Sequence, residues 1–124
     1  MKTLIAGVPR SGKTTLALEM GMKSKTRVYH TDDLIEKHSW SIQSDEVACW
    51  FNMKNYIIEG VTIPRALRKW LSLCKGKPCD EIIWLATPRS TLTGGLLSMA
   101  KGCISIMNEI EDELIKRGVK IIVQ

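Results

Sequence analysis

The feature that most restricts how this chain can fold is a glycine-rich segment close to its start. Residues 7 to 14 read GVPRSGKT, which fits the pattern G-x-x-x-x-G-K-[ST] at every fixed position. An apolar run at 4–6 precedes the segment, and a stretch compatible with a helix follows it at 15–22. Strand, loop and helix in that order are what a phosphate-binding loop requires. A glycine turn that only joins a strand to a helix is the simpler alternative, but the four fixed positions would coincide by chance in roughly one such chain in several hundred.

The residue types in this segment suit a bound polyphosphate. Glycines let successive backbone N–H groups turn inward, and those groups lie at a helix N-terminus, where negative charge is favoured. Lys13 would reach the β and γ phosphates, and the hydroxyl of Thr14 would bind Mg²⁺. The sequence therefore predicts that ATP or GTP binds, with Mg²⁺, to Gly7, Pro9, Arg10, Ser11, Gly12, Lys13, Thr14 and Thr15.

Length and composition indicate an ordinary globular domain. A chain of 124 residues has room for one packed core, so we expect a single domain over residues 1–124. Hydrophobic residues make up 44% of the chain and charged residues 25%. The sequence contains neither a recognisable signal peptide nor an apolar stretch as long as a membrane span. We therefore expect a cytoplasmic protein that does not engage a membrane.

The net charge of +5 allows two interpretations. Much of the excess positive charge lies between Arg65 and Lys77, with more between Lys23 and Arg27. A surface for nucleic acid is one interpretation. We favour a solvated face that also attracts phosphate ligands, because the basic cluster lacks the interleaved aromatic residues of a nucleic-acid surface.

Apolar runs alternate with helical segments along the chain. Near-continuous apolar runs predict strands at 2–6, 27–30, 56–59, 81–86 and 119–123. Helices are expected at 12–22, at 44–53 with Ser44 as N-cap, at 64–74, and at 96–117 with Gly118 after its end. This order predicts an α/β three-layer sandwich, in which helices cover both faces of a five-stranded parallel sheet. Ligands of such sheets bind beyond the carboxyl ends of the strands.

Charged side chains follow those predicted strand ends. Asp32 and Asp33 follow the second strand, Glu59 ends the third, and Arg89 follows the fourth. Asp32 is the favoured residue for an acceptor or a metal and Asp33 the second, although one of the two would cap a short helix at 34–37. Glu59 would hold the water shell of a metal. Arg89 would close over the phosphates from a mobile loop, and a plain surface charge is the alternative. His30 lacks partners at metal-ligand spacing and is interpreted as a structural residue.

These residues resemble those of small P-loop kinases of the nucleoside-monophosphate and shikimate kinase type. Residues 7–14 are typical of P-loop proteins in general, and 29–34 (YHTDDL) resemble the acidic segment after the second strand in small-molecule and polynucleotide 5′-hydroxyl kinases. Residues 57–60, followed by Pro64-Arg65, are similar to the Asp-Gly-Phe-Pro-Arg stretch of monophosphate kinases, with Glu in place of Asp. The resemblance implies a minimal P-loop NTPase fold of the kinase type, ATP with Mg²⁺, transfer of the γ-phosphoryl group, and a supporting role for Arg65.

Three functions are consistent with this reading. The first is a small kinase that uses Lys13, Asp32 and Arg89 and acts on a nucleotide, a nucleoside or another small hydroxyl or phosphate acceptor. The second is a polynucleotide 5′-hydroxyl kinase, favoured by the acidic segment and the net charge. The third is a nucleotide-binding interaction or regulatory protein with little catalysis. It is favoured because the related kinases usually carry two or more arginines in a lid, where this chain offers Arg89 and Lys101.

Overall fold

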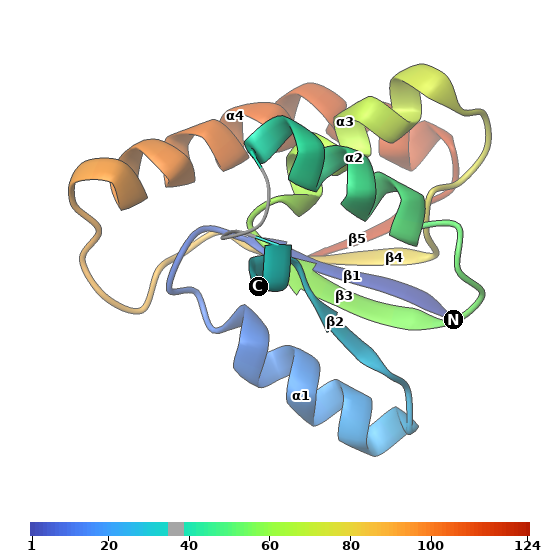
Figure 1. The fold of residues 1–124 in the computed structure, drawn as a ribbon, viewed down its shortest axis with the longest axis horizontal. Helices are drawn as coiled ribbons and strands as arrows, with labels where there is room; N and C mark the ends of the chain where they lie inside the picture. Colours follow the sequence, from blue (N-terminus) through green and yellow to red (C-terminus); the bar gives the residue numbers. More distant parts are fainter. Residues whose placement is uncertain (35–38) are drawn as a thin grey trace.

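The computed structural model of the protein describes residues 1–34 and 39–124. Five parallel strands form one sheet in the order β2-β3-β1-β4-β5 (Figure 1). The strands are β1 (Lys2–Gly7), β2 (Val28–His30), β3 (Tyr56–Gly60), β4 (Glu81–Leu85) and β5 (Lys120–Val123). The helices are α1 (Lys13–Ser24), the short 3₁₀ helix η1 (Thr31–Leu34), α2 (Trp40–Trp50), α3 (Ile63–Leu73) and α4 (Gly94–Lys116). The predicted α/β class and the five-stranded parallel sheet are confirmed.

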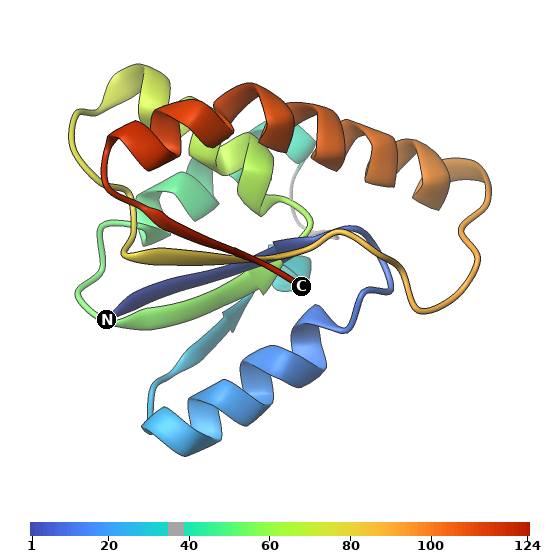
Figure 2. The same cartoon turned by 180° about the vertical axis from the view of Figure 1, so that it is seen from behind.

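The helices divide unequally between the two faces of the sheet. Figure 1 shows α2, α3 and α4 on one face and α1 on the other, and the reverse view in Figure 2 shows the same arrangement. Successive strand residues alternate between these faces. Ile5 and Ile83 pack with Ala17 of α1, whereas Leu4 and Ile82 belong to the larger core beneath the other three helices. Both faces of the central strands are therefore covered, as their continuous apolar runs require.

The strand register brings the ends of β1, β2 and β3 to one edge of the sheet. Ala6 of β1 lies opposite Gly60 of β3, and Glu59 of β3 lies opposite His30 of β2. The loop after β1 and the η1 helix after β2 consequently begin on either side of the end of β3. This edge, the carboxyl edge of a parallel sheet, is where such folds bind ligands.

The predicted start of the second helix was wrong. Helix α2 begins at Trp40, and Ser39 is its N-cap, with Oγ accepting a hydrogen bond from the Ile42 N–H at 3.4 Å. Ser44 lies inside the helix, where its hydroxyl donates to the Trp40 carbonyl at 3.0 Å. A serine can bond a carbonyl one turn back as readily as it can cap a helix, so the serine pattern in this segment was ambiguous.

The predicted end of the second helix, at residue 53, lies three residues beyond its observed end at Trp50, and the remaining predicted boundaries agree with the structure or differ by one or two residues. Gly118 follows the end of α4 with φ 92, so its predicted role after that helix is confirmed. Of the short helix predicted at 34–37, Leu34 is the last residue of η1, and 35–37 lie outside the described residues.

Candidate nucleotide-binding site

The loop between β1 and α1 has a strained backbone. Gly12 has φ 92, and Arg10 has φ 60, in the left-handed region that non-glycine residues avoid. The left-handed conformation costs a non-glycine residue such as Arg10 about 1–2 kcal/mol. The Val8 N–H donates to the Leu85 carbonyl at 3.1 Å, which ties the start of the loop to β4. Strained turns held by their surroundings in this way are typical of functional loops, and their N–H groups form concave anion sites.

Lys13 lies inside the loop rather than on the surface. Its side chain is buried, and Nζ donates to the Val8 carbonyl at 2.8 Å and to Ser11 Oγ at 3.5 Å. Burial lowers the pKa of Lys13, and the negative charges of Glu59 and Asp32 oppose that shift. The ammonium group is therefore held by oxygen atoms of its own loop, in a place that suits phosphate oxygens.

A buried carboxylate joins three elements at the floor of the site. Glu59 on β3 is only 1% exposed. Its Oε2 accepts a hydrogen bond from the Thr14 hydroxyl at 2.6 Å and lies 3.3 Å from Nδ1 of His30. The hydroxyl comes from the first turn of α1 and the imidazole from the end of β2. Glu59 thus fixes the phosphate loop to the two strands beside it.

Asp32 faces the same site from η1. Burial raises the pKa of Asp32, and the neighbouring charge of Glu59 raises it further, while Lys13 acts in the opposite direction. The position of η1 depends on Gly60, which ends β3 with φ 150. A Cβ at Gly60 would overlap the hydroxyl of Thr31, so only glycine allows η1 to approach β3 this closely. Asp33, the next residue, is exposed and lies outside the set of described residues that line the site.

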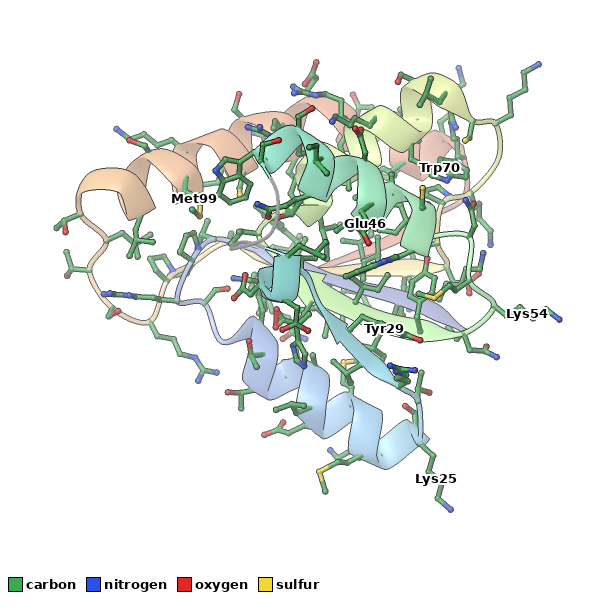
Figure 3. The ribbon with its side chains drawn as sticks, viewed as in Figure 1. Lys25, Tyr29, Glu46, Lys54, Trp70 and Met99 are labelled. Carbon is green, nitrogen blue, oxygen red and sulfur yellow. The ribbon has the colours of Figure 1, made fainter. Side chains whose placement is uncertain are left out.

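The predicted loop residues gather around one cavity of about 280 Å³, which we call the phosphate-loop cavity. Gly7 is the exception: it lies beside β4, where a Cβ would come within 2.6 Å of the Leu85 carbonyl oxygen. Figure 3 shows the Met99 side chain on the side of α4 that faces the sheet, above the loop. The lining consists of Pro9, Arg10, Ser11, Gly12, Lys13, Thr14, Thr15, Asp32, Glu59, Val61, Leu96 and Met99.

Of the three predicted arginines, Arg10 lines this cavity, whereas Arg89 and Arg65 lie outside its lining. The Arg89 N–H donates to the Arg10 carbonyl at 2.8 Å, and its guanidinium lies over Gly12, where a Cβ would be 2.7 Å from the guanidinium carbon. Arg65, on α3, lines a second cavity of about 290 Å³ that shares Val61 and Met99 with the first. The structure therefore brings together Lys13, Thr14, Asp32 and Glu59. Arg65 and Arg89 lie close to this group but do not line its cavity.

Sequence reasoning missed His30, Val61, Leu96 and Met99. His30 was interpreted as a structural residue, yet it contacts the buried Glu59. The signal that could have identified it is its position at the end of a strand, two residues before Asp32. The other three residues are apolar, and nothing in their local sequence distinguishes them from core residues.

The oxygen donors around the loop fit Mg²⁺. Across residues 1–34 and 39–124, no three His, Cys, Asp or Glu side chains form a group able to hold a metal by themselves. Mg²⁺ in phosphate sites uses one or two protein oxygens together with phosphate oxygens and water. The Thr14 hydroxyl and the Glu59 carboxylate, which are in contact, supply that kind of donor set.

Comparison with known proteins supports the architecture. No protein-family model and no curated protein sequence matches this chain. Among solved structures, a shikimate kinase from Aquifex aeolicus vf5 matches with a TM-score of 0.58 and 14% identity, covering 98% of this chain and 86% of that chain. The chain therefore shares the α/β P-loop fold of that enzyme. The likeness extends to the fold alone, because an identity this low does not carry substrate or activity.

A second P-loop kinase structure is more distant. Shikimate kinase from Acinetobacter baumannii, in complex with shikimate, matches with a TM-score of 0.49 and 13% identity, covering 100% of this chain and 83% of that chain.

In the part of the chain that the structure describes, no helix combines the length and the apolar character needed to cross a bilayer.

Proposed function

We propose that the protein is a small kinase that binds a nucleoside triphosphate with Mg²⁺ and transfers the γ-phosphoryl group to a small acceptor. One observation carries this proposal: Lys13, Thr14, Asp32 and Glu59 converge on a cavity that adjoins a second cavity. The first has the groups that phosphates and Mg²⁺ require, and the second has room for an acceptor.

The triphosphate would lie with its β and γ phosphates in the loop. Lys13 would exchange its hydrogen bond to the Val8 carbonyl for bonds to phosphate oxygens, while the inward N–H groups bind the remaining oxygens. Because Lys13 is already buried and oriented, little side-chain entropy remains to be lost on binding. ATP and GTP share the phosphates that these groups would recognise.

Thr14 and Glu59 would hold the metal. The Thr14 hydroxyl is the direct ligand in this proposal, and Glu59 orients the hydroxyl and the water shell through its 2.6 Å contact. When bound, Mg²⁺ neutralises charge on the β and γ phosphates. His30, at the end of β2, contacts the same carboxylate oxygen and so helps to fix the position of Glu59.

Asp32 would act on the acceptor. Its raised pKa suits a carboxylate that takes a proton from an acceptor hydroxyl, as a general base does. In the transfer, the acceptor oxygen forms a bond to the γ phosphorus, and the bond from that phosphorus to the β–γ bridging oxygen breaks. The hydroxyl proton passes to Asp32. Arg89, beside Gly12, would stabilise the charge on the transferred group after a small movement of its loop, and Asp33 would support Asp32.

The test is transfer of label from [γ-³²P]ATP with Mg²⁺. The acceptors are nucleosides, nucleoside monophosphates, shikimate and other small alcohols, and 5′-hydroxyl oligonucleotides. We expect a labelled small-molecule product that Lys13→Ala abolishes, with Lys23→Ala on the exposed surface of α1 as the matched control. Labelled oligonucleotide would favour a polynucleotide kinase instead. Saturable ATP binding without any product would favour a nucleotide-binding interaction protein.

A further inference from the structure

Three flat side chains form a row beside β2, the edge strand of the sheet, which we call the β2-edge row. Arg27 directly precedes β2, and its guanidinium carbon lies 4.9 Å from the centre of the Tyr29 ring. The centres of the Tyr29 and Trp50 rings are 5.9 Å apart, and their planes are tilted by 45°. Trp50 is the last residue of α2, so the row is complete only in the folded chain.

The β2-edge row is fixed in place and open to solvent. The Arg27 carbonyl accepts a hydrogen bond from the Ile57 N–H at 3.2 Å, which holds the start of the row against β3. Tyr29 and Trp50 pack against the large core, yet both remain partly exposed, and Arg27 is exposed. The described residues that line the phosphate-loop cavity and the second cavity do not include any of the three. The row is therefore a surface separate from the proposed kinase site.

Two lysines add positive charge next to the row. Lys25 precedes β2, and Lys54 precedes β3. Because these strands pair in parallel, with Val28 opposite Ile57, their first residues lie at the same edge of the sheet. Figure 3 shows the side chains of both lysines extending away from the body of the protein.

The positive charge around the row is not neutralised by acids. Within residues 1–34 and 39–124, Lys25, Arg27 and Lys54 form no salt bridge. In the basic cluster between Arg65 and Lys77, by contrast, three side chains are bound to acids: Arg68 to Glu109 at 3.1 Å, Lys69 to Asp45 at 2.8 Å and Lys77 to Asp80 at 3.4 Å. Cations without acidic partners are the ones that attract a polyanion most strongly.

This combination of groups suits a single-stranded nucleic acid. Unpaired bases stack on aromatic rings and on guanidinium planes, and lysine and arginine contact the phosphates between the bases. A duplex keeps its bases stacked on one another, so the rings of the row could not reach them. A basic residue on an edge strand also prevents pairing with another sheet, but that role does not require two adjacent rings.

We propose that the β2-edge row binds a short stretch of single-stranded nucleic acid. A base would stack against Tyr29 and Trp50, and the neighbouring phosphates would bind Lys25, Arg27 and Lys54. Stacking accepts every base, so binding would tolerate changes of sequence. The proposal goes beyond the kinase function and does not depend on it, because the row shares no residue with the phosphate-loop cavity.

Fluorescence anisotropy with three probes tests the proposal. The probes are oligothymidylate, oligouridylate and a DNA duplex of the same length, each with fluorescein on a 5′ end, which blocks the hydroxyl that a polynucleotide kinase would use. We expect at least one of the two single strands to bind about tenfold more tightly than the duplex, and the tighter strand identifies DNA or RNA. A plot of the logarithm of the affinity against that of the salt concentration should have a slope of about −2, as three phosphate contacts predict.

Matched variants assign the binding to the row. Arg27→Gln should make the salt slope shallower by about 0.7, whereas Arg68→Gln, which removes an equal charge that is paired with Glu109, should leave it unchanged. Tyr29→Val keeps a residue suited to a strand but removes the ring, and it should weaken strand binding about tenfold. Tyr29→Phe keeps the ring and should retain the affinity.

Photo-crosslinking locates the strand without any variant. A single strand that contains 5-iodouracil is irradiated with wild-type protein, and the modified peptide is identified by mass spectrometry. We expect the crosslink on Tyr29 or Trp50. This result does not depend on the stability of Tyr29→Val.

Five results would overturn the proposal. The first three are duplex binding as tight as that of both single strands, an equal change of slope in Arg27→Gln and Arg68→Gln, and crosslinks confined to residues outside the row. The fourth is displacement of the strand by a saturating non-hydrolysable ATP analogue with Mg²⁺, because it would place the strand in the phosphate-loop cavity. The fifth is binding of phosphatidylserine vesicles without binding of either strand, which would identify a lipid surface instead. A protein that binds the ATP analogue but neither strand would refute the row and leave the proposed kinase function standing.

Discussion

The hydroxyl of Thr14 donates a 2.6 Å hydrogen bond to the carboxylate of Glu59, 45 residues away in the chain. This contact connects the first turn of α1 to the end of β3, and His30 approaches the same carboxylate oxygen from β2. The proposed metal ligand is therefore oriented by groups from two strands. Preorganisation of this kind is what distinguishes a metal–phosphate site from a glycine turn.

Glu59→Gln should weaken metal-dependent nucleotide binding. The amide keeps the shape of the side chain but removes the charge that orients Thr14 and the metal's water. Loss of such a supporting group typically reduces metal affinity by about 10–100-fold. A fluorescent ATP analogue titrated with and without Mg²⁺ measures the effect, and Glu19→Gln on the exposed face of α1 is the control. Equal Mg²⁺ dependence in wild type and Glu59→Gln would remove Glu59 from the site.

His30→Ala should act through Glu59. The imidazole lies 3.3 Å from the carboxylate oxygen, so its removal leaves Glu59 less constrained and lowers Mg²⁺ affinity by about tenfold. His30→Asn, which keeps a hydrogen-bonding group on the same strand, should recover part of that affinity. A competition assay with a Mg²⁺-sensitive dye reports this without relying on turnover. A purely structural role for His30 would instead lower the melting temperature and leave Mg²⁺ affinity unchanged.

Asp32→Asn should stabilise the free protein and impair transfer. The pKa of Asp32 is raised in the folded state, so folded protein binds the proton more tightly than unfolded protein does. Stability from this group is present at low pH and is lost as pH rises from the ordinary carboxyl range through the raised pKa. At neutral pH the variant should melt roughly 1–3 °C higher, a small gain because Asp32 is partly exposed to solvent.

The rate of phosphoryl transfer should depend on the protonation of the same Asp32 carboxylate. Transfer by wild-type protein should decline as pH falls through the Asp32 pKa, because a protonated base cannot accept the acceptor proton. Asp32→Asn should lower kcat much more than nucleotide affinity. Asp112→Asn, at an exposed position of α4, is the control for both measurements. A variant with normal kcat would exclude Asp32 as the base.

Gly60→Ala should destabilise the fold by about 2–3 kcal/mol, because a methyl group there overlaps the Thr31 hydroxyl and the backbone has φ 150. Gly95→Ala should instead stabilise by about 0.4–1 kcal/mol, since its methyl group enters open space and restricts the unfolded chain. Urea unfolding of the two variants measures both effects. Similar stability for Gly60→Ala and wild type would show that η1 is not held tightly against β3.

The sequence was most informative where the site is contiguous. The phosphate loop is one segment of eight residues, so its spacing alone predicted Lys13 and Thr14 as candidate site residues. Asp32 and Glu59 were recognised because each follows or ends an apolar strand, and the carboxyl ends of parallel strands meet at one edge.

The remaining features depend on long-range packing. The contact between His30 and Glu59 requires the register of β2 against β3, which no local pattern encodes. The second cavity, which Arg65 lines, depends on how α4 packs over α3, and the glycines of α4 that line it resemble ordinary helix interruptions when they are read in the sequence. Arg89 was predicted to lie near the phosphates, and its contact with Gly12 depends on how the loop after β4 packs.

The most direct test of the central claim is Mg²⁺-dependent ATP binding, measured by calorimetry on wild type, Lys13→Met and Lys23→Met. Burial lowers the pKa of Lys13, so replacement by an uncharged side chain should leave the free protein folded while removing the group that binds phosphate. We predict ATP binding that Mg²⁺ strengthens in wild type and Lys23→Met, and its loss in folded Lys13→Met. Equal ATP binding by Lys13→Met and wild type would contradict the account.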